Sequence, residues 1–321
     1  SSLITQNKQN DLISNRSNVI AALNETMGHY NIALEQNKKA VRILEKILPA
    51  HHPDLAAIYM NIGTTYQGLT AYDKALVYQE KCLAIFKKIL PSNHSNLASV
   101  YINIGNTYLH LTAYKKALVY QKKCLAIWEK TLPVSHPNLA TIYINIATIY
   151  AYLTAYKKAL VYQKKCLAIR EEILPSNHPD LATIYMNIAT TYAYLTTYNK
   201  TLFYQEKCLV IRKEILPSNH PDLASIYNNI ANTYHALAAY KKALVYQKKC
   251  LAIREEILSS NHPNLAIIYK NISITYIGLA EKTKASYYIE KAIAIYKKMP
   301  DYAAAKYKYA LETKEFIKQN M

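Results

Sequence analysis

Residues 178–219 read HPDLATIYMNIATTYAYLTTYNKTLFYQEKCLVIRKEILPSN, and most of the chain repeats this 42-residue pattern. The opening His-Pro-Asp/Asn-Leu-Ala keeps one register throughout, with Ser95 replacing the proline once. A fixed period of about 20–50 residues is typical of repeat proteins, so we expect one continuous array rather than separate globular domains. The six opening histidines are His52, His94, His136, His178, His220 and His262.

Each copy is predicted to hold two helices, which we call helix A and helix B. Pro179 suits the first position of a helix, because no N–H is needed there, and Asp180 faces the positive end of the helix dipole. Apolar residues then recur every three or four positions as far as Leu195, which predicts helix A. A second stripe of this kind stops at Pro175 in the preceding copy, which predicts helix B.

Both helices carry a recurring set of motif residues. They are Tyr185-Met186-Asn187-Ile188-Ala189 and Tyr192 in helix A, and Tyr156, Ala159, Ala168-Ile169-Arg170-Glu171 and Leu174-Pro175 in helix B. With these residues the unit resembles the 42-residue tetratricopeptide repeat of kinesin light chains and similar proteins. The resemblance is strong over 52–299 and weak over 10–51. It implies an all-α fold, a right-handed superhelical solenoid of helix-turn-helix repeats whose helix A residues line a concave peptide-binding groove.

The register predicts an N-terminal extension at 1–9, seven repeats over 10–299 and a C-terminal capping helix at 300–321. The first repeat matches well only in helix B, from Tyr30 to Pro49, and the last repeat has Lys282 where others have tyrosine. Terminal repeats must present a soluble face, which explains such departures. The predicted repeats are 10–51 (divergent), 52–93, 94–135, 136–177, 178–219, 220–261 and 262–299.

Two repeated positions depart from the family pattern. The turn between helices A and B usually has glycine, whereas this chain has Thr70, Thr112, Thr154 and Thr196, so we expect a less tight turn. A position that usually has alanine carries cysteine. Neighbouring copies place these cysteines about 10 Å apart, the spacing of packed helices, whereas a disulfide needs Cα atoms within about 7 Å. We therefore expect small, buried free thiols and a reducing, cytoplasmic compartment for Cys82, Cys124, Cys166, Cys208 and Cys250.

The chain is strongly basic, with 39 Lys and Arg against 21 Asp and Glu, a net charge of +18. Such a field attracts acidic peptides, polyanions or an anionic membrane. Lysine pairs such as Lys115-Lys116 and Lys122-Lys123 lie two turns apart along helix B, which faces outward in the resembling family. We interpret them as a solvated outer surface; nucleic acid or acidic lipid is the alternative ligand.

Other functional classes are disfavoured by the sequence. Residues 139–156 and 181–198 are uncharged, but they contain asparagine and threonine and are followed at once by Lys-rich helices, so we expect buried helices rather than membrane spans. No HExxH motif, CxxC pair, phosphate loop or paired catalytic carboxylates occur, so we expect no enzyme activity, no cofactor and no metal within these residues. The six opening histidines are too far apart to share one zinc ion, and we assign them to helix starts.

Comparison of the copies singles out one face of helix A. Framework positions barely change, whereas one position reads Met60, Ile102, Ile144, Met186, Asn228 and Lys270. Further variable positions read Thr64, Asn106, Thr148, Thr190, Asn232, Ile274; Gln67, Leu109, Ala151, Ala193, His235, Ile277; and Gly68, His110, Tyr152, Tyr194, Ala236, Gly278. Offsets of four and seven to eight lie on one face of a helix. Either a ligand or a weak packing constraint explains the variation.

An invariant asparagine lies beside these positions, at Asn61, Asn103, Asn145, Asn187, Asn229 and Asn271. In peptide-binding tetratricopeptide proteins the matching asparagine bonds the main chain of an extended ligand, although an inter-repeat hydrogen bond explains it equally. We predict partner contacts at Met60, Asn103, Asn106, His110, Ile144, Asn145, Tyr152, Met186, Asn187, Tyr194, Asn228, Asn229, Asn232 and His235.

The expected function is that of an interaction scaffold that binds a protein or peptide segment, acidic in character, in the groove. One alternative is that the chain is the recognition arm of a larger enzyme whose catalytic domain lies outside it. The other is a basic surface that binds nucleic acid or membrane, with nucleic acid disfavoured.

Overall fold

The computed structural model describes residues 29–299 and 304–320. It divides into an N-terminal unit, residues 1–169, and a C-terminal unit, residues 170–321. The predicted extension at 1–9 and the first helix of the repeat at 10–51 lie outside the described residues. Where the chain is described, it is all-α, as predicted, and contains no strand.

Helices of 16 and 18 residues alternate from α3 to α12. The first helices are α2 (Tyr30–Ile47), α3 (Pro53–Gly68), α4 (Tyr72–Ile89), α5 (Ser95–His110), α6 (Tyr114–Thr131), α7 (Pro137–Tyr152) and α8 (Tyr156–Ile173), in which the division falls. The C-terminal unit continues with α9 (Pro179–Tyr194), α10 (Tyr198–Ile215), α11 (Pro221–Ala236), α12 (Tyr240–Ile257), α13 (Pro263–Gly278), α14 (Lys282–Tyr296) and α15 (Ala304–Asn320).

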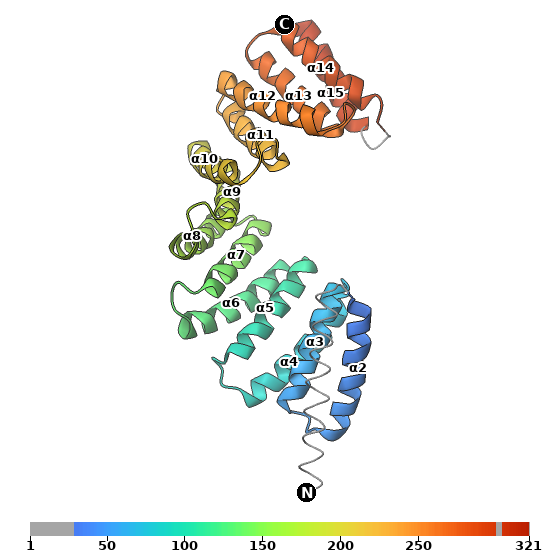
Figure 1. Cartoon of the computed structure of the whole chain (residues 1–321), viewed down its shortest axis with the longest axis vertical. Helices are drawn as coiled ribbons and strands as arrows, with labels where there is room; N and C mark the ends of the chain where they lie inside the picture. The colour runs from blue at the N-terminus through green and yellow to red at the C-terminus, as the bar shows by residue number, and fades with distance from the viewer. Residues whose placement is uncertain (1–28, 300–303, 321) are drawn as a thin grey trace. The chain divides into compact units, whose positions relative to one another are not determined.

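Consecutive helices pack against one another within each unit. Helix A packs on helix B of its own repeat, as α3 does on α4, and helix B packs on the next helix A, as α4 does on α5. Figure 1 shows the helices of each unit following one another in chain order as such pairs. The predicted helix-turn-helix repeats are confirmed.

The core is made by the apolar stripes that the sequence predicts. Ile62, Ile104 and Ile146 occupy one repeated position of helix A, and each is 0% exposed. Burying such a side chain contributes about 1.5–3 kcal/mol of stability. Among the described residues, no helix combines the length and the apolar character needed to cross a membrane.

The repeated histidines begin helix A, as predicted. The Nδ1 atom of His178 accepts a hydrogen bond from the backbone N–H of Asp180 at 3.1 Å, and Pro179 fills the first helical turn. The other five opening histidines make the same bond at 3.1–3.2 Å. Each cap satisfies an N–H group that the helix leaves unpaired, which is typically worth about 1 kcal/mol.

The threonine turn after helix A is as tight as a glycine turn, so the expectation of a looser turn is wrong. Thr112 takes the left-handed conformation with φ 56°. Its N–H bonds the carbonyl of Leu109 at 3.0 Å, and the N–H of Ala113 bonds the carbonyl of Tyr108 at 2.9 Å. These two bonds form a Schellman motif, which satisfies the last carbonyls of the helix despite the β-branched side chain. The same conformation, with φ 54–56°, occurs at Thr70, Thr154, Thr196, Ala238 and Ala280.

Candidate functional site

Three adjoining pockets lie along helices α9, α11 and α13 of the C-terminal unit. Two lie between α9 and α11, with cavity volumes of about 260 and 360 Å³, and the third lies between α11 and α13, with about 210 Å³. Met186 and Asn229 line both of the first two pockets, and Asn232 lines the second and the third. Because neighbouring pockets share lining residues they adjoin one another, and we call the row of three the helix A groove.

The helix A groove brings together six of the seven candidate residues of the C-terminal unit. In the repeat register they occupy offsets of zero, one, four, seven and eight residues along helix A, which lie on one face of the helix. The exception is Asn228, which is half-buried and whose Oδ1 atom is buried without a hydrogen-bond partner among the described residues. The six residues are Met186, Asn187, Tyr194, Asn229, Asn232 and His235.

Two members of the asparagine row contact the methionine of the preceding repeat. Asn103 Nδ2 lies 3.3 Å from Met60 Sδ in the N-terminal unit, and Asn229 Nδ2 lies 3.9 Å from Met186 Sδ in the C-terminal unit. A thioether sulfur is a weak acceptor, so this contact orients the amide while using little of its hydrogen-bonding capacity. The inter-repeat contact and a role toward a ligand are therefore compatible at Asn229, which is exposed.

Buried glutamines of helix B form the floor of the groove, and sequence reasoning missed them. Gln205 and Gln247 line the second and third pockets, although they are only 5% and 1% exposed. Gln205 Oε1 accepts a hydrogen bond from the Thr233 hydroxyl at 3.0 Å, and Gln247 Nε2 donates to the carbonyl of Asn271 at 3.2 Å. The available signal was a glutamine recurring every 42 residues inside an apolar stripe, at Gln79, Gln121, Gln163, Gln205 and Gln247.

The candidate residues of the N-terminal unit lie on the corresponding helices. Asn106 Oδ1 accepts a hydrogen bond from Gln121 Nε2 at 2.7 Å, so this amide helps to hold helices α5 and α6 together. Ile144 and Asn145 are half-buried on α7. A Cβ atom at Gly105 would lie 2.8 Å from Gln121 Nε2, which explains the small residue at this position of helix A.

The last residue of helix A stacks on the first residue of the preceding helix B. The His110 ring lies 4.8 Å from that of Tyr72, and the Tyr152 ring lies 4.9 Å from that of Tyr114, both nearly parallel. Tyr152 is nevertheless 58% exposed, and Tyr194, at the same position in α9, is 63% exposed. These tyrosines therefore keep large accessible surfaces, as a partner anchor requires.

The middle of the helix A groove is uncharged. Burial lowers the pKa of His235, so its imidazole is neutral near pH 7. The charged residues that line the groove, Arg212 and Asp222, lie in the first pocket and pair at 3.4 Å. The polar groups of the second and third pockets are therefore amides, hydroxyl groups and a neutral imidazole rather than ions.

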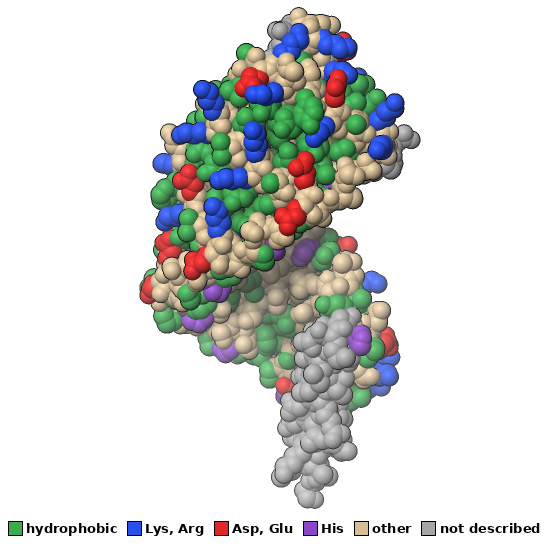
Figure 2. All heavy atoms as spheres, turned by 45° about the horizontal axis from the view of Figure 1, so that its top comes forward, with side chains coloured by type: hydrophobic (Ala, Val, Ile, Leu, Met, Phe, Trp, Pro, Cys, Tyr) green, Lys and Arg blue, Asp and Glu red, His purple; other side chains and the backbone are tan. Residues whose placement is uncertain are grey.

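The lysines of helix B are exposed, but many of them also cover tyrosine rings. Lys123 Nζ lies 5.7 and 5.1 Å from the ring centroids of Tyr101 and Tyr120, and Lys116 Nζ lies 5.4 Å from that of Tyr108. Cation–π contacts of this kind contribute about 0.5–1 kcal/mol at exposed sites. The face turned forward in Figure 2 shows basic side chains scattered among apolar and acidic ones. Part of the lysine excess thus stabilises the repeats.

The cysteines are buried free thiols. Burial raises the pKa of Cys82 and of Cys124 to about 12, so these thiols remain protonated and unreactive near neutral pH. Within the described ranges, no three His, Cys, Asp or Glu side chains gather closely enough to hold a metal ion.

The helix pairs and the shared register define a helical-repeat protein. The tetratricopeptide repeat model matches residues 11–88, 96–172, 180–256 and 222–298, and the chain belongs to this family. Repeats of this family generally mediate protein–protein interaction and are typically non-catalytic. No curated protein matches the sequence.

Several solved structures share the fold. A putative kinesin light chain from Podosopora anserina, with nearly identical TPR-like repeats, is 22% identical with a TM-score of 0.58, covering 65% of this chain and 99% of its own. The C-terminal part of a TPR repeat-containing protein from Cytophaga hutchinsonii is 17% identical with a TM-score of 0.66, covering 92% and 98%. The apo form of RapI is 17% identical with a TM-score of 0.71, covering 96% and 85%.

Proposed function

We propose that this chain is a scaffold that binds a peptide segment of a partner protein in the helix A groove. The observation that carries the proposal is the row of three adjoining pockets along α9, α11 and α13. An extended segment needs such a row, because its side chains enter successive pockets while its main chain runs between them.

The groove offers both kinds of contact that peptide binding requires. Tyr194 and Met186 supply apolar surface in the second pocket, together with the small Ala193. Asn229 and Asn232 supply exposed amides, each with donors and an acceptor suited to peptide N–H and C=O groups. The mixture of an aromatic anchor and neighbouring amides favours a peptide over a purely apolar ligand.

Charge favours an acidic partner. The net charge of +18 creates a field that accelerates the approach of an acidic segment, while the neutral groove makes the close contacts. Five buried free thiols are compatible with a reducing compartment, and we infer a cytoplasmic location.

Site-specific photo-crosslinking tests this proposal. Peptides are first selected from a displayed random library by the full chain. A benzophenone amino acid is then placed at Tyr194 in the groove or at Tyr287 on α14, which is similarly exposed at 53%. Crosslinking of the selected peptide from position 194 but not from position 287 supports the proposal. Crosslinking from position 287 alone overturns it.

A further inference from the structure

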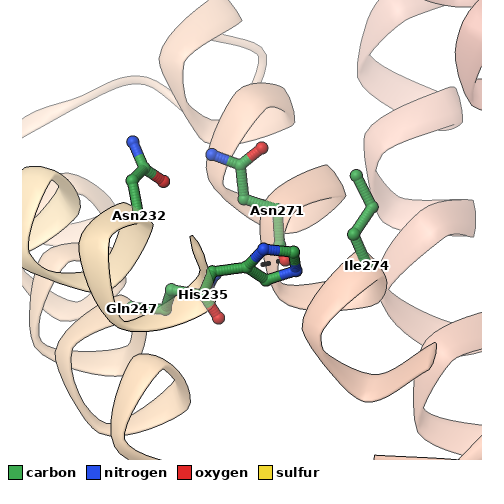
Figure 3. Close-up of a pocket in the computed structure, with 5 residues that line it drawn as sticks. All are labelled: Asn232, His235, Gln247, Asn271 and Ile274. Atoms are coloured by element: carbon green, nitrogen blue, oxygen red, sulfur yellow. Dashed lines mark hydrogen bonds between the residues drawn. The ribbon is translucent and has the colours of Figure 1, made fainter. Parts of the chain in front are cut away.

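The third pocket of the helix A groove differs in composition from the other two. It lies between α11 and α13 and is lined by Asn232, His235, Gln247, Asn271 and Ile274. Figure 3 shows the His235 ring reaching from α11 towards α13, with Ile274 on the far wall. The ring also packs edge-on against Tyr240, with centroids 5.1 Å apart, which fixes its orientation. The pocket is thus a polar chamber with one apolar wall.

This chamber is not suited to an ionic group. None of its five lining residues is an acid, a lysine or an arginine. Burial also keeps His235 neutral near pH 7. A carboxylate or an ammonium group that entered would lose its hydration without gaining an opposite charge, which is unfavourable.

One acceptor in the chamber is left unpaired. The Gln247 amide must turn its Nε2 atom toward the carbonyl of Asn271, because that oxygen only accepts, and the bond measures 3.2 Å. The Gln247 Oε1 atom is then buried without a partner among the described residues. Gln121 Oε1 is buried without a partner at the same repeat position among the described residues, so this oxygen belongs to the framework of the repeat. The polar side chains left to meet a ligand in the chamber are those of Asn232, His235 and Asn271.

We propose that the third pocket is a subsite for an uncharged side-chain carboxamide, asparagine or glutamine, of the bound peptide. A primary amide has two N–H donors and one acceptor, so it can pair with the neutral imidazole of His235 and with the Asn232 amide at once. A hydroxyl has only one donor, and an aliphatic side chain has none. This inference rests on the proposed function and adds a specificity to it.

The chain supplies its own comparison for the two polar wall residues. The preceding repeat carries Thr190 and Ala193 where this one carries Asn232 and His235. The second pocket, lined by Thr190 and Ala193, is correspondingly more apolar in its walls. A peptide that lies along the groove and places an Asn or Gln side chain in the third pocket is therefore held in one register.

The test uses the full chain with the double substitution Asn232→Thr and His235→Ala, residues that neighbouring repeats carry at the same positions. The matched control is Asn199→Thr with His51→Ala, the same two replacements at exposed positions outside the groove. The probe is a peptide selected on the unmodified chain, synthesised with each Asn or Gln replaced in turn by Asp, Glu or Leu. Affinities are measured by fluorescence anisotropy, and circular dichroism verifies folding.

For the unmodified chain and the control, one Asn or Gln replacement is expected to weaken binding by about tenfold or more, the effect of an unpaired buried hydrogen-bonding group. In the groove double variant, the same replacement in the peptide is expected to weaken binding by only about threefold or less. The carboxamide subsite is overturned if replacing the Asn or Gln weakens binding equally in the groove double variant and in the control. It is also overturned if no selected peptide contains an Asn or Gln whose replacement weakens binding. Crosslinking of the selected peptide from position 287 alone instead overturns the proposed function itself.

Discussion

Tyr152 at the end of α7 lies face to face on Tyr114 at the start of α6, with ring centroids 4.9 Å apart and planes inclined by 8°. The two residues are 38 positions apart and belong to neighbouring repeats, so the stack ties one repeat to the next. Tyr152 is therefore both a packing residue and a candidate contact residue. His110 makes the same stack on Tyr72, so an imidazole ring as well as a phenol ring is accommodated at this position.

Replacing Tyr152 by alanine is expected to lower the free energy of unfolding by about 0.5–1.5 kcal/mol. This is what the stacking of two aromatic rings contributes in addition to the burial of their surface. Urea denaturation followed by circular dichroism measures the change. Tyr152→His serves as the control, because His110 occupies this position in the preceding repeat, and it should retain most of the stability. Equal losses for the alanine and histidine variants would contradict the stacking interpretation.

Replacing Thr154 by glycine is expected to stabilise the chain. Thr154 has φ 55°, a left-handed conformation that costs a residue with a Cβ atom about 1–2 kcal/mol. Part of the gain is offset by the greater freedom of glycine in the unfolded chain, which leaves about 0.5–1 kcal/mol. Thermal denaturation measures the difference. A lower melting temperature for Thr154→Gly would show that the turn is not strained.

Alkaline pH is expected to unfold the repeats. Burial first, and then the hydrogen bond to Glu129 at 2.9 Å, raise the pKa of Tyr143 from 10.0 to about 12. The folded state holds this proton more tightly than the unfolded state. The contribution of Tyr143 to the free energy of unfolding is therefore complete below pH 10 and is lost as the pH rises towards 12. Urea midpoints measured across this range should fall, and Tyr143→Phe should make the fall shallower. An identical slope in the phenylalanine variant would remove Tyr143 as a cause.

The thiols are expected to resist labelling while the chain is folded. Burial raises the pKa of Cys250 to about 11, and the residue is 0% exposed, so thiolate is scarce and inaccessible at pH 8. A thiol reagent should therefore react slowly until concentrated guanidinium chloride unfolds the chain. Rapid reaction of all cysteines under native conditions would mean that the repeats open readily.

Sequence predicted the helix starts well because their causes are local. His178, Pro179 and Asp180 lie within one turn, and the capping bond they make depends on no other part of the chain. The left-handed Thr112 was not predicted, because threonine disfavours that conformation and only the packing of two helices imposes it. Local propensity and tertiary packing conflict there, and packing dominates.

The groove was predicted only in part, for a physical reason. Variation among copies pointed to Asn232 and His235, since both lie on the same face of helix A. Gln247 lies on helix B inside the apolar stripe that runs from Ala243 to Leu251, and this signal of burial was overlooked because a polar helix residue is usually solvated. Its hydrogen bond to the carbonyl of Asn271 on α13 is a tertiary contact, which sequence periodicity does not reveal.

Peptide binding in the helix A groove is tested most directly by comparing two variants of the full chain for their affinity for a library-selected peptide. The groove variant combines Met186→Ala with Tyr194→Ala, and the outer variant combines Lys241→Glu with Lys248→Glu on α12, both lysines being exposed. Loss of a central anchor costs about 2 kcal/mol or more, so the groove variant should bind about thirtyfold more weakly at any salt concentration. The lysine variant should bind more weakly only at low salt, because exposed charges mainly steer association. If the lysine variant no longer binds the peptide while the groove variant binds it unchanged, the peptide binds the outer lysine surface and not the helix A groove.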